Sequence, residues 1–372
     1  MKRIDQIDSA EMFIVKLPLV KPFETSFSVQ THREALLLKI TSNNVDGWGE
    51  CVTSPDPYYS YETNSTAAHI IKDFLVAILM NFKYFSVEEV LQKFERIRGH
   101  NMAKAAVENA LLDLLARKCE LPLFELIGGQ SKKIMSGISI GIKENIDDLL
   151  ELIQIACDKK YQRIKIKIKK GQDIEILKAV RNTFPDIHLM ADANADYSYE
   201  DSHILKQFDA FNLMMIEQPL SYDDIHLHSL LQKQINTPIC LDESIKNLTD
   251  AETAAALGSC RIINIKQGRV GGMTKSKEIQ EFCQNNNIKV WSGGMLETGI
   301  GRAFNIHLQT LPGFVLPGDT SETSRYFTED IVDKPVILEP DGFIQIPEGT
   351  GIGVQVVTER LERFKVYYER IG

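Results

Sequence analysis

Short apolar runs recur at an almost constant interval from about residue 134 onward. Eight such runs end at Gly141, Lys167, Asp192, Glu217, Asp242, Lys266, Ser292 and Gly318. Consecutive ends lie 24 to 26 residues apart, which leaves room for one strand, one helix and two tight turns in each interval. Parallel strands with intervening helices close into a barrel when this unit is repeated eight times. The interval therefore predicts an α/β protein with a (β/α)8-type barrel.

The first part of the chain has another pattern. The stretches "MFIVKLPLV", "EALLLKITS" and "GWGEC" are typical of strands joined by short turns, and two helical stretches follow them. In the second helical stretch, residues 101–118, apolar side chains share one stripe at helical spacing. They are Ala103, Val107, Ala110, Leu111, Leu114 and Leu115. We expect an α+β domain over residues 1–125, followed by the barrel over residues 126–329.

The composition excludes several classes of function. With 372 residues, 44% hydrophobic and 25% charged, the chain is typical of a soluble protein. A net charge of −9 argues against nucleic acid or an anionic membrane as a partner. The run "FLVAILM" at 74–80 is too short to span a bilayer, and acidic residues occupy the N-terminus where a signal peptide needs an apolar segment. Six scattered cysteines predict reduced thiols in a cytoplasmic protein, several of them in the core.

Charged residues stand at the ends of five consecutive predicted strands. Lys165 and Lys167 share one face of the second, the third to fifth end in Asp192, Glu217 and Asp242, and the sixth ends in Lys266. A single aspartate at a strand end is usually a helix cap or a turn residue, and a lysine face is usually solvated. Barrel strands are covered by helices outside and packed inside, so neither interpretation accounts for the whole set. We predict one charged cavity at the carboxyl ends of the strands.

Three neighbouring carboxylates indicate a metal site, because without a cation they repel one another and become partly protonated. Oxygen ligands at this charge density favour Mg²⁺, with Mn²⁺ as a substitute. No histidine or cysteine ends these strands, which argues against zinc. His226 and His228 form an H-x-H pair, but they fall in a predicted helix, where we expect surface residues rather than ligands.

Lys167 and Lys266 flank the carboxylates from opposite sides of the predicted barrel. A base, a second base or acid, and a metal between them suit removal of a proton α to a carboxylate, through a doubly charged enediolate. Arg269 is expected to favour the neutral form of Lys266 by charge repulsion. Asn194 and Asn264 have the same strand parity as Asp192 and Lys266, so we expect them to orient the ligands, whereas Glu243 should point away.

These motifs resemble the enolase superfamily, and within it the muconate-lactonising-enzyme-like subgroup. The hallmark positions read Lys165-Ile166-Lys167, Asp192-Ala193-Asn194, Glu217-Gln218-Pro219, Asp242-Glu243-Ser244 and Lys266. Nearly the whole chain is similar. The segments "NIKQGRVGGM", "WSGGMLETGIGRAFN" and "LPGDTS" are similar to the o-succinylbenzoate synthase / N-succinylamino acid racemase branch. The resemblance implies a modified (β/α)7β TIM barrel and an N-terminal α+β capping domain, which the segment 330–372 completes.

The resemblance also implies a chemistry and a substrate class. Lys167 and Lys266 become the acid/base pair, and Asp192, Glu217 and Asp242 the Mg²⁺ ligands. The substrate is a small carboxylate with a succinyl group, and the segments 20–28 and 53–63 close over it. Substrate contacts and supporting residues would be Lys165, Asn194, Asn264, Arg269, Ser139, Gly293, Gly294, Met295, Phe23 and Tyr58. Glu24 departs from the pattern, in which a basic residue is common. Relatives are homo-oligomers, either dimers or octamers.

The implied reaction is dehydration of 2-succinyl-6-hydroxy-2,4-cyclohexadiene-1-carboxylate in menaquinone synthesis, together with racemisation of N-succinyl or N-acylamino acids. A dedicated racemase remains open. A dipeptide epimerase needs an acidic pair after strand eight, where this chain has Asp319 alone, and a mandelate-racemase-like enzyme needs a histidine where Ser292 stands. A muconate cycloisomerase or an inactive structural barrel stays as a further alternative. The glycines at 293–301 offer backbone N–H groups to a succinyl carboxylate.

Overall fold

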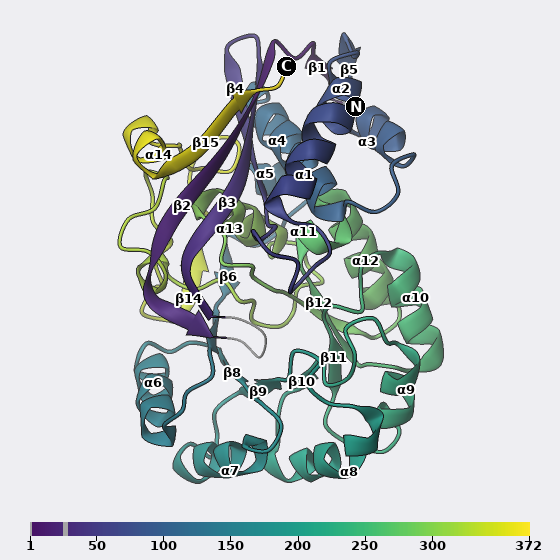
Figure 1. Cartoon of the computed structure of the whole chain (residues 1–372), viewed down its shortest axis with the longest axis vertical. Coiled ribbons are helices and arrows are strands. Elements are labelled where there is room, and N and C mark those ends of the chain that lie inside the picture. Colours follow the sequence, from purple (N-terminus) through teal and green to yellow (C-terminus); the bar gives the residue numbers. More distant parts are fainter. Residues whose placement is uncertain (1, 25–28) are drawn as a thin grey trace.

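A computed structural model describes residues 2–24 and 29–372. Figure 1 shows two parts stacked along the long axis: an antiparallel sheet with helices, which holds both chain ends, and a curled parallel sheet surrounded by helices. The predicted substrate-covering segment 20–28 falls partly on residues 25–28, outside the described residues. None of the described helices combines the length and the apolarity of a bilayer-spanning segment.

The capping domain is built on a four-stranded antiparallel sheet in the order β15-β2-β3-β4. Its strands are β2 (Ser9–Glu24), β3 (Val29–Ser42), β4 (Val45–Cys51) and β15 (Lys365–Arg370). Asn43 and Asn44 join β3 to β4 with φ angles of 52° and 61°, the left-handed conformation that tight hairpin turns require. Because β15 pairs with β2, the last residues of the chain complete the sheet of the first domain.

Helices cover one face of this sheet. They are α1 (Asn64–Ile70), the π-helix η1 (Ile71–Val76), α2 (Ala77–Leu79), α3 (Val87–Phe94), α4 (Asn101–Lys118) and α5 (Leu123–Ile127). Helix α14 (Thr358–Phe364) precedes β15 and lies toward the other face, where Leu361 borders a cavity with Phe13 and Trp48. All six residues of the predicted apolar stripe of α4 are buried, but the buried surface extends beyond it to fourteen residues, Glu108, Asn109 and Asp113 among them. This helix lies between the sheet and the barrel, so both of its sides need partners. Two short pairs, β1 (Ile4–Asp5) with β5 (Tyr84–Phe85) and β6 (Lys133–Met135) with β14 (Phe343–Gln345), add small sheets.

The barrel contains seven regular parallel strands in chain order. They are β7 (Gly137–Ile140), β8 (Arg163–Lys167), β9 (Leu189–Asp192), β10 (Ile216–Glu217), β11 (Ile239–Leu241), β12 (Ile262–Ile265) and β13 (Lys289–Ser292). The eighth predicted strand, "FVLPG", is not a regular strand: Phe314 and Gly318 form only isolated bridges, to Val290 and Ser136. Pro317 has no N–H to donate to a ladder, which explains the irregular eighth segment.

The connecting helices surround the sheet (Figure 1). They are α6 (Ile146–Asp158), α7 (Asp173–Thr183), η2 (Tyr199–Asp201), α8 (Ser202–Leu205), η3 (Lys206–Phe211), α9 (His226–Gln232), α10 (Leu248–Leu257), α11 (Gln267–Val270), α12 (Met273–Asn285) and α13 (Gly299–Leu308), with η4 (Thr323–Arg325) after the barrel. The expectation of a surface histidine pair was wrong for His228. Its ring is fully buried and accepts a hydrogen bond from the Leu220 N–H, so it stabilises the loop after β10.

One continuous apolar core runs through both domains. A second cluster, Met190, Met215, Cys240, Ile262 and Trp291, fills the barrel interior. All six cysteines are unpaired and four are buried, which confirms the prediction that several lie in the core.

Two buried glutamates of the capping domain cap barrel helices. Glu50 of β4 accepts hydrogen bonds from the N–H groups of Thr298 and Gly301 at the start of α13. Glu108 of α4 accepts from the N–H of Thr274 at the start of α12, at 2.9 Å. Both carboxylates lose their water in the interface, and this burial raises the pKa of each to about 7 against the opposing effect of the hydrogen bonds. The domains are therefore joined by carboxylates at helix N-termini, where the helix dipole favours negative charge.

Candidate active site

The charged residues predicted from the strand ends lie together at one rim of the barrel. In the parallel ladder, Lys167 is paired with Asp192, and Asp192 with Glu217. Asp242 directly follows β11, and Lys266 directly follows β12. Alternation along each strand points these side chains inward, where 7% or less of each carboxylate residue and of Lys165 and Lys266 is exposed. The barrel thus brings six charged groups into one buried space.

Each carboxylate of this rim is paired with a cation from another strand. Lys167 Nζ lies 2.6 Å from Asp192 Oδ2, and Lys165 Nζ lies 3.0 Å from Glu217 Oε2. Lys266 Nζ lies 2.8 Å from Asp242 Oδ2, and Arg269 bonds the other oxygen of Asp242. In this state the chain neutralises its own carboxylates.

Burial and ion pairing have opposite effects on these acids. Burial alone would raise the pKa of Asp192, but Lys167 and Lys165 outweigh it and hold the pKa below its usual range. The pKa of Asp242 is lowered in the same way by Arg269 and Lys266. Glu217 differs, because burial and the charge of Asp192 raise its pKa to about 8 despite Lys165. Glu217, the middle carboxylate of the row, is therefore the one that is protonated most readily.

The donor set fits a hard divalent cation, although the present arrangement is not a preformed cage. Among the described residues, no three Asp, Glu, His or Cys side chains converge on one point as metal ligands. The lysines pair with the carboxylates, and burial and the charge of Asp192 still raise the pKa of Glu217. A dication among Asp192, Glu217 and Asp242 would relieve that repulsion, and oxygen-only ligands suit Mg²⁺.

Two asparagines hold parts of this row. Asn264 donates to Glu217 Oε1 at 2.7 Å. The backbone N–H of Asn194 donates to Asp192 Oδ1 at 3.0 Å, and its side-chain amide donates to Glu243. Glu243 is not one of the three paired carboxylates; it lies against an adjoining cavity.

Arg269 disfavours the charge of Lys266 as expected, but the expected net lowering of the Lys266 pKa was wrong. Burial and Arg269 do oppose the charge of Lys266, but the carboxylate of Asp242 outweighs them, and the pKa of Lys266 is raised well above its ordinary value. Arg269 is turned toward Asp242 and shares it, so it acts on the same carboxylate rather than on the lysine alone. The hydroxyl of Tyr59 lies 3.0 Å from Lys266 Nζ and 3.2 Å from Arg269 Nη1.

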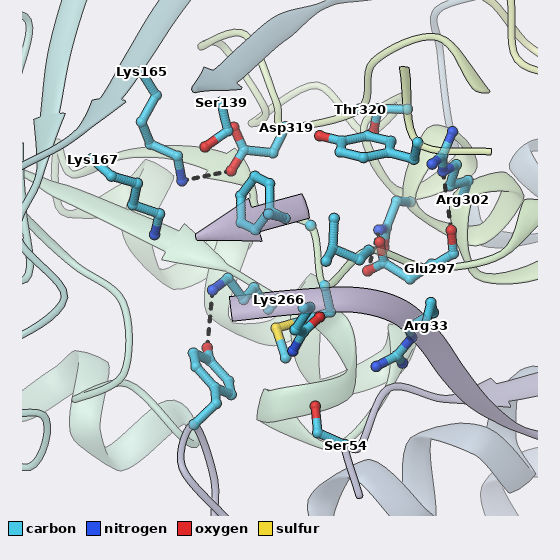
Figure 2. Close-up of a pocket in the computed structure, with 18 of the residues that line it drawn as sticks. Arg33, Ser54, Ser139, Lys165, Lys167, Lys266, Glu297, Arg302, Asp319 and Thr320 are labelled. Carbon is cyan, nitrogen blue, oxygen red and sulfur yellow. Dashed lines mark hydrogen bonds and ion pairs between the residues drawn. The ribbon is translucent and has the colours of Figure 1, made fainter. Parts of the chain in front are cut away.

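A pocket opens over the lysines, between the two domains (Figure 2). Its charged floor carries Lys165, Lys167 and Lys266, and of the predicted contacts Ser139, Asn194, Gly294, Met295 and Phe23 also line it. Gly293 lies behind the lining: a Cβ there would come within 2.4 Å of Asn264 and 2.8 Å of Lys266, so only glycine fits. Tyr58 does not line this pocket. It is 66% exposed and faces the adjoining cavity, and its neighbour Tyr59 occupies the place beside Lys266.

Several lining residues were not among the predicted contacts. They are Gln30, Arg33, Ser54, Tyr59, Leu296, Glu297, Arg302, Asn305, Asp319, Thr320 and Tyr326. Figure 2 shows Arg33, Glu297 and Arg302 on the side of the pocket away from Lys165 and Lys167. Asp319 had a sequence signal, because it directly follows the eighth apolar run. Arg33 and Ser54 had none, because their place depends on how the capping domain sits on the barrel.

Both carboxylate oxygens of Asp319 are paired with cations of the chain. Its two oxygens lie 2.5 Å from Arg163 Nη2 and 2.6 Å from Lys165 Nζ. The carboxylate that a dipeptide epimerase would use to hold a substrate ammonium is therefore taken by the chain's own cations.

Comparison with known proteins gives concordant matches for both parts of the chain. Residues 148–360 match the family described as enolase C-terminal domain-like, and residues 9–128 match the mandelate racemase / muconate lactonizing enzyme N-terminal domain. An o-succinylbenzoate synthase of Geobacillus kaustophilus is 45% identical over 351 residues, covering 94% of this chain and 93% of that protein. An N-succinylamino acid racemase of Thermus thermophilus is 41% identical over 362 residues, covering 97% and 98%.

A solved structure supports the same likeness in three dimensions. A crystal structure of an enolase superfamily member from Listeria innocua superposes with a TM-score of 0.95 at 41% identity, covering 99% of each chain. The predicted fold class, a modified barrel with an N-terminal capping domain, is confirmed.

Proposed function

The chain belongs to the enolase superfamily, and from that premise we propose that it is a Mg²⁺-dependent o-succinylbenzoate synthase that also racemises N-succinylamino acids. The observation that carries the proposal is the placement of the lysines. Lys167 ends β8 and Lys266 directly follows β12, the three carboxylates stand at the ends of the strands between them, and both lysines line one pocket.

The metal would be held by Asp192, Glu217 and Asp242, which supply only oxygen donors. Bound there, Mg²⁺ would supply the positive charge that offsets the second negative charge developing on the substrate carboxylate. The ammonium of Lys165, which lies beside Asp192 and Glu217, would also offset the charge of the substrate carboxylate.

The two lysines would carry the proton transfers. Lys167 is paired with Asp192, so it accepts a proton only after that pair opens and its ammonium has lost its own proton. In dehydration, Lys167 removes the α-proton and returns it to the leaving hydroxyl, which departs as water, while the ammonium of Lys266 stabilises the enediolate. In racemisation, Lys167 removes the α-proton from one face and Lys266 supplies a proton to the other.

A dedicated N-succinylamino acid racemase is the second candidate, supported by relatives that carry that name. The epimerase alternative is weaker, because Asp319 is bonded to Arg163 and Lys165. We further propose a cytoplasmic homo-oligomer, a dimer or an octamer, with domains at 1–125 plus 330–372 and at 126–329, acting in menaquinone synthesis.

The test is a paired assay of the purified protein in Mg²⁺. One arm measures loss of the diene absorbance of 2-succinyl-6-hydroxy-2,4-cyclohexadiene-1-carboxylate, and the other measures α-proton exchange of each N-succinylamino acid enantiomer in D₂O. We expect turnover in both arms and loss of both after chelation. Exchange without diene loss would favour the dedicated racemase, and full activity after chelation would refute the metal assignment.

A further inference from the structure

Lys165 is shared by three carboxylates. Its Nζ lies 2.6 Å from Asp319 Oδ2, 3.0 Å from Glu217 Oε2 and 3.4 Å from Asp192 Oδ2. The contact to Glu217 is a hydrogen bond, and those to Asp319 and Asp192 are ion pairs. Two of these partners belong to the proposed metal site, and the shortest contact is to the third, Asp319.

Asp319 is held rigidly from the other side. Its Oδ1 accepts from Arg163 Nη2 at 2.5 Å, and Arg163 Nε donates to the Pro317 carbonyl at 3.1 Å. The Arg163 side chain is completely buried, and a Cβ on Gly137 would lie 2.3 Å from its Nη2, so the guanidinium fills a space that only glycine leaves open. The carboxylate of Asp319 therefore has a fixed position beside Lys165.

Trp291 forms the base of this arrangement. Its ring centroid lies 4.7 Å from the Arg163 guanidinium carbon and 5.0 Å from Lys165 Nζ. The face of an indole attracts cations, so it stabilises both buried charges. The indole N–H is turned toward Cys240 Sγ at 3.3 Å, which fixes the ring.

A cation entering between Asp192 and Glu217 must displace the Lys165 ammonium from both. A buried ammonium left without a partner is costly, so the displacement is favourable only if another carboxylate receives it. Asp319 is the one other carboxylate that the described residues place in contact with Lys165.

We propose that Asp319 is a positioning residue that keeps the Lys165 ammonium paired when a divalent cation displaces it from Asp192 and Glu217, and thereby sets the affinity of the site for that cation. This inference rests on the proposed function, because it takes Asp192 and Glu217 as metal ligands. In this role the carboxylate of Asp319 pairs with Lys165 of the same chain and does not bind the substrate.

Binding of Mg²⁺ to the chelator-treated protein tests this without turnover. The chain has two tryptophans, and Trp48→Phe leaves Trp291 as the reporter beside Lys165. In that background we expect Asp319→Asn to weaken Mg²⁺ binding about tenfold, the size expected for loss of a buried charged partner. Asp319→Glu keeps the charge and should restore most of the affinity. If Mg²⁺ does not change the emission of Trp291, calorimetric titration gives the same dissociation constants.

A matched control and a double variant separate positioning from simple loss of charge. Asp209→Asn removes a carboxylate of the same domain that bonds the backbone of Asn236 and Thr237, and it should leave Mg²⁺ binding unchanged. In a Lys165→Met background, Asp319→Asn should lose its effect, because the residue through which it acts is gone. The melting temperature in chelator confirms that each variant is folded.

Equal Mg²⁺ dissociation constants for wild type and Asp319→Asn would overturn this inference but leave the proposed function standing. The same tenfold loss with Lys165→Met present would also overturn it, since the carboxylate would then act on the metal directly. Absence of Mg²⁺ binding by the wild-type protein would remove the metal from the proposed function and this inference with it.

Discussion

The barrel and the capping domain reach the same pocket by different means. Barrel residues such as Lys167, Asp192 and Glu217 come one per strand and are held level by the hydrogen-bond ladder. Capping-domain residues such as Tyr59 and Arg33 come from a loop and a long hairpin, and their place depends on buried contacts between the domains. The barrel therefore fixes the positions of the charged groups, and the capping domain fixes the shape of the space above them.

The same difference appears in the buried acids of the two regions. The barrel carboxylates are paired with lysines and with Arg269, whereas Glu50 and Glu108 of the capping domain bond to backbone N–H groups of barrel helices. Removing a charge from the first set should change chemistry, and removing one from the second should change stability.

The largest effect is expected at the middle of the barrel row. Glu217→Gln should reduce turnover by about 10⁴ or more in both reactions, because a neutral amide is a poor ligand for a hard dication. The protein should stay folded, since the carboxylate it removes already has a raised pKa. Steady-state rates and a thermal melt in chelator measure the two effects. Glu243→Gln, a buried glutamate outside the row, should retain far more activity; equal losses would mean that Glu243 belongs to the ligand set.

The next largest effect should differ between the synthase and the racemase reactions. Lys266→Arg keeps a positive charge opposite Lys167 but cannot exchange a proton at neutral pH. We expect racemisation of N-succinylamino acids to vanish while a measurable fraction of synthase turnover survives, whereas Lys167→Ala should abolish both. The measurement is α-proton exchange in D₂O beside loss of diene absorbance. Racemisation at the wild-type rate by Lys266→Arg would rule out the two-base mechanism.

A pH-dependent effect is expected at the domain interface. Burial raises the pKa of Glu108 from 4.5 to about 7. Between these values the unfolded chain has lost the proton that the folded chain keeps. This contribution to stability is therefore complete below pH 4.5 and is lost as the pH rises through 7, by about 3 kcal/mol.

Glu108→Gln removes that titration. Its free energy of unfolding should fall about 3 kcal/mol less than that of wild type between pH 4 and pH 8. Denaturant melts across this range measure the difference, and the exposed Glu252→Gln should follow the wild-type curve. Parallel curves for wild type and Glu108→Gln would show that Glu108 titrates at its ordinary pKa.

The smallest effect is expected at the tip of the capping loop. Tyr58 is 66% exposed, so Tyr58→Ala should change the free energy of unfolding by less than about 0.5 kcal/mol and act mainly on KM. Tyr59→Phe removes only a hydroxyl but breaks contacts to Lys266 and Arg269, so it should lower kcat more. A larger loss of kcat in Tyr58→Ala than in Tyr59→Phe would reverse the assignment of the two tyrosines.

The sequence predicted the barrel portion of the site well, and the reason is geometric. One residue per β/α unit and a fixed strand parity are enough to place Asp192, Glu217 and Lys266 at one rim. The capping domain was predicted as a fold, but not Tyr59 in place of Tyr58, because a loop has no periodicity to show which side chain turns inward. The raised pKa of Lys266 was also missed, since it depends on how Asp242 divides its oxygens between two cations.

The pairing of every rim carboxylate with a cation of the same chain bears on how this protein matures. A newly made polypeptide that buried three bare acids would need an ion from its surroundings to finish folding. Here the lysines act as built-in counter-ions, so we expect the barrel to fold without a metal ion.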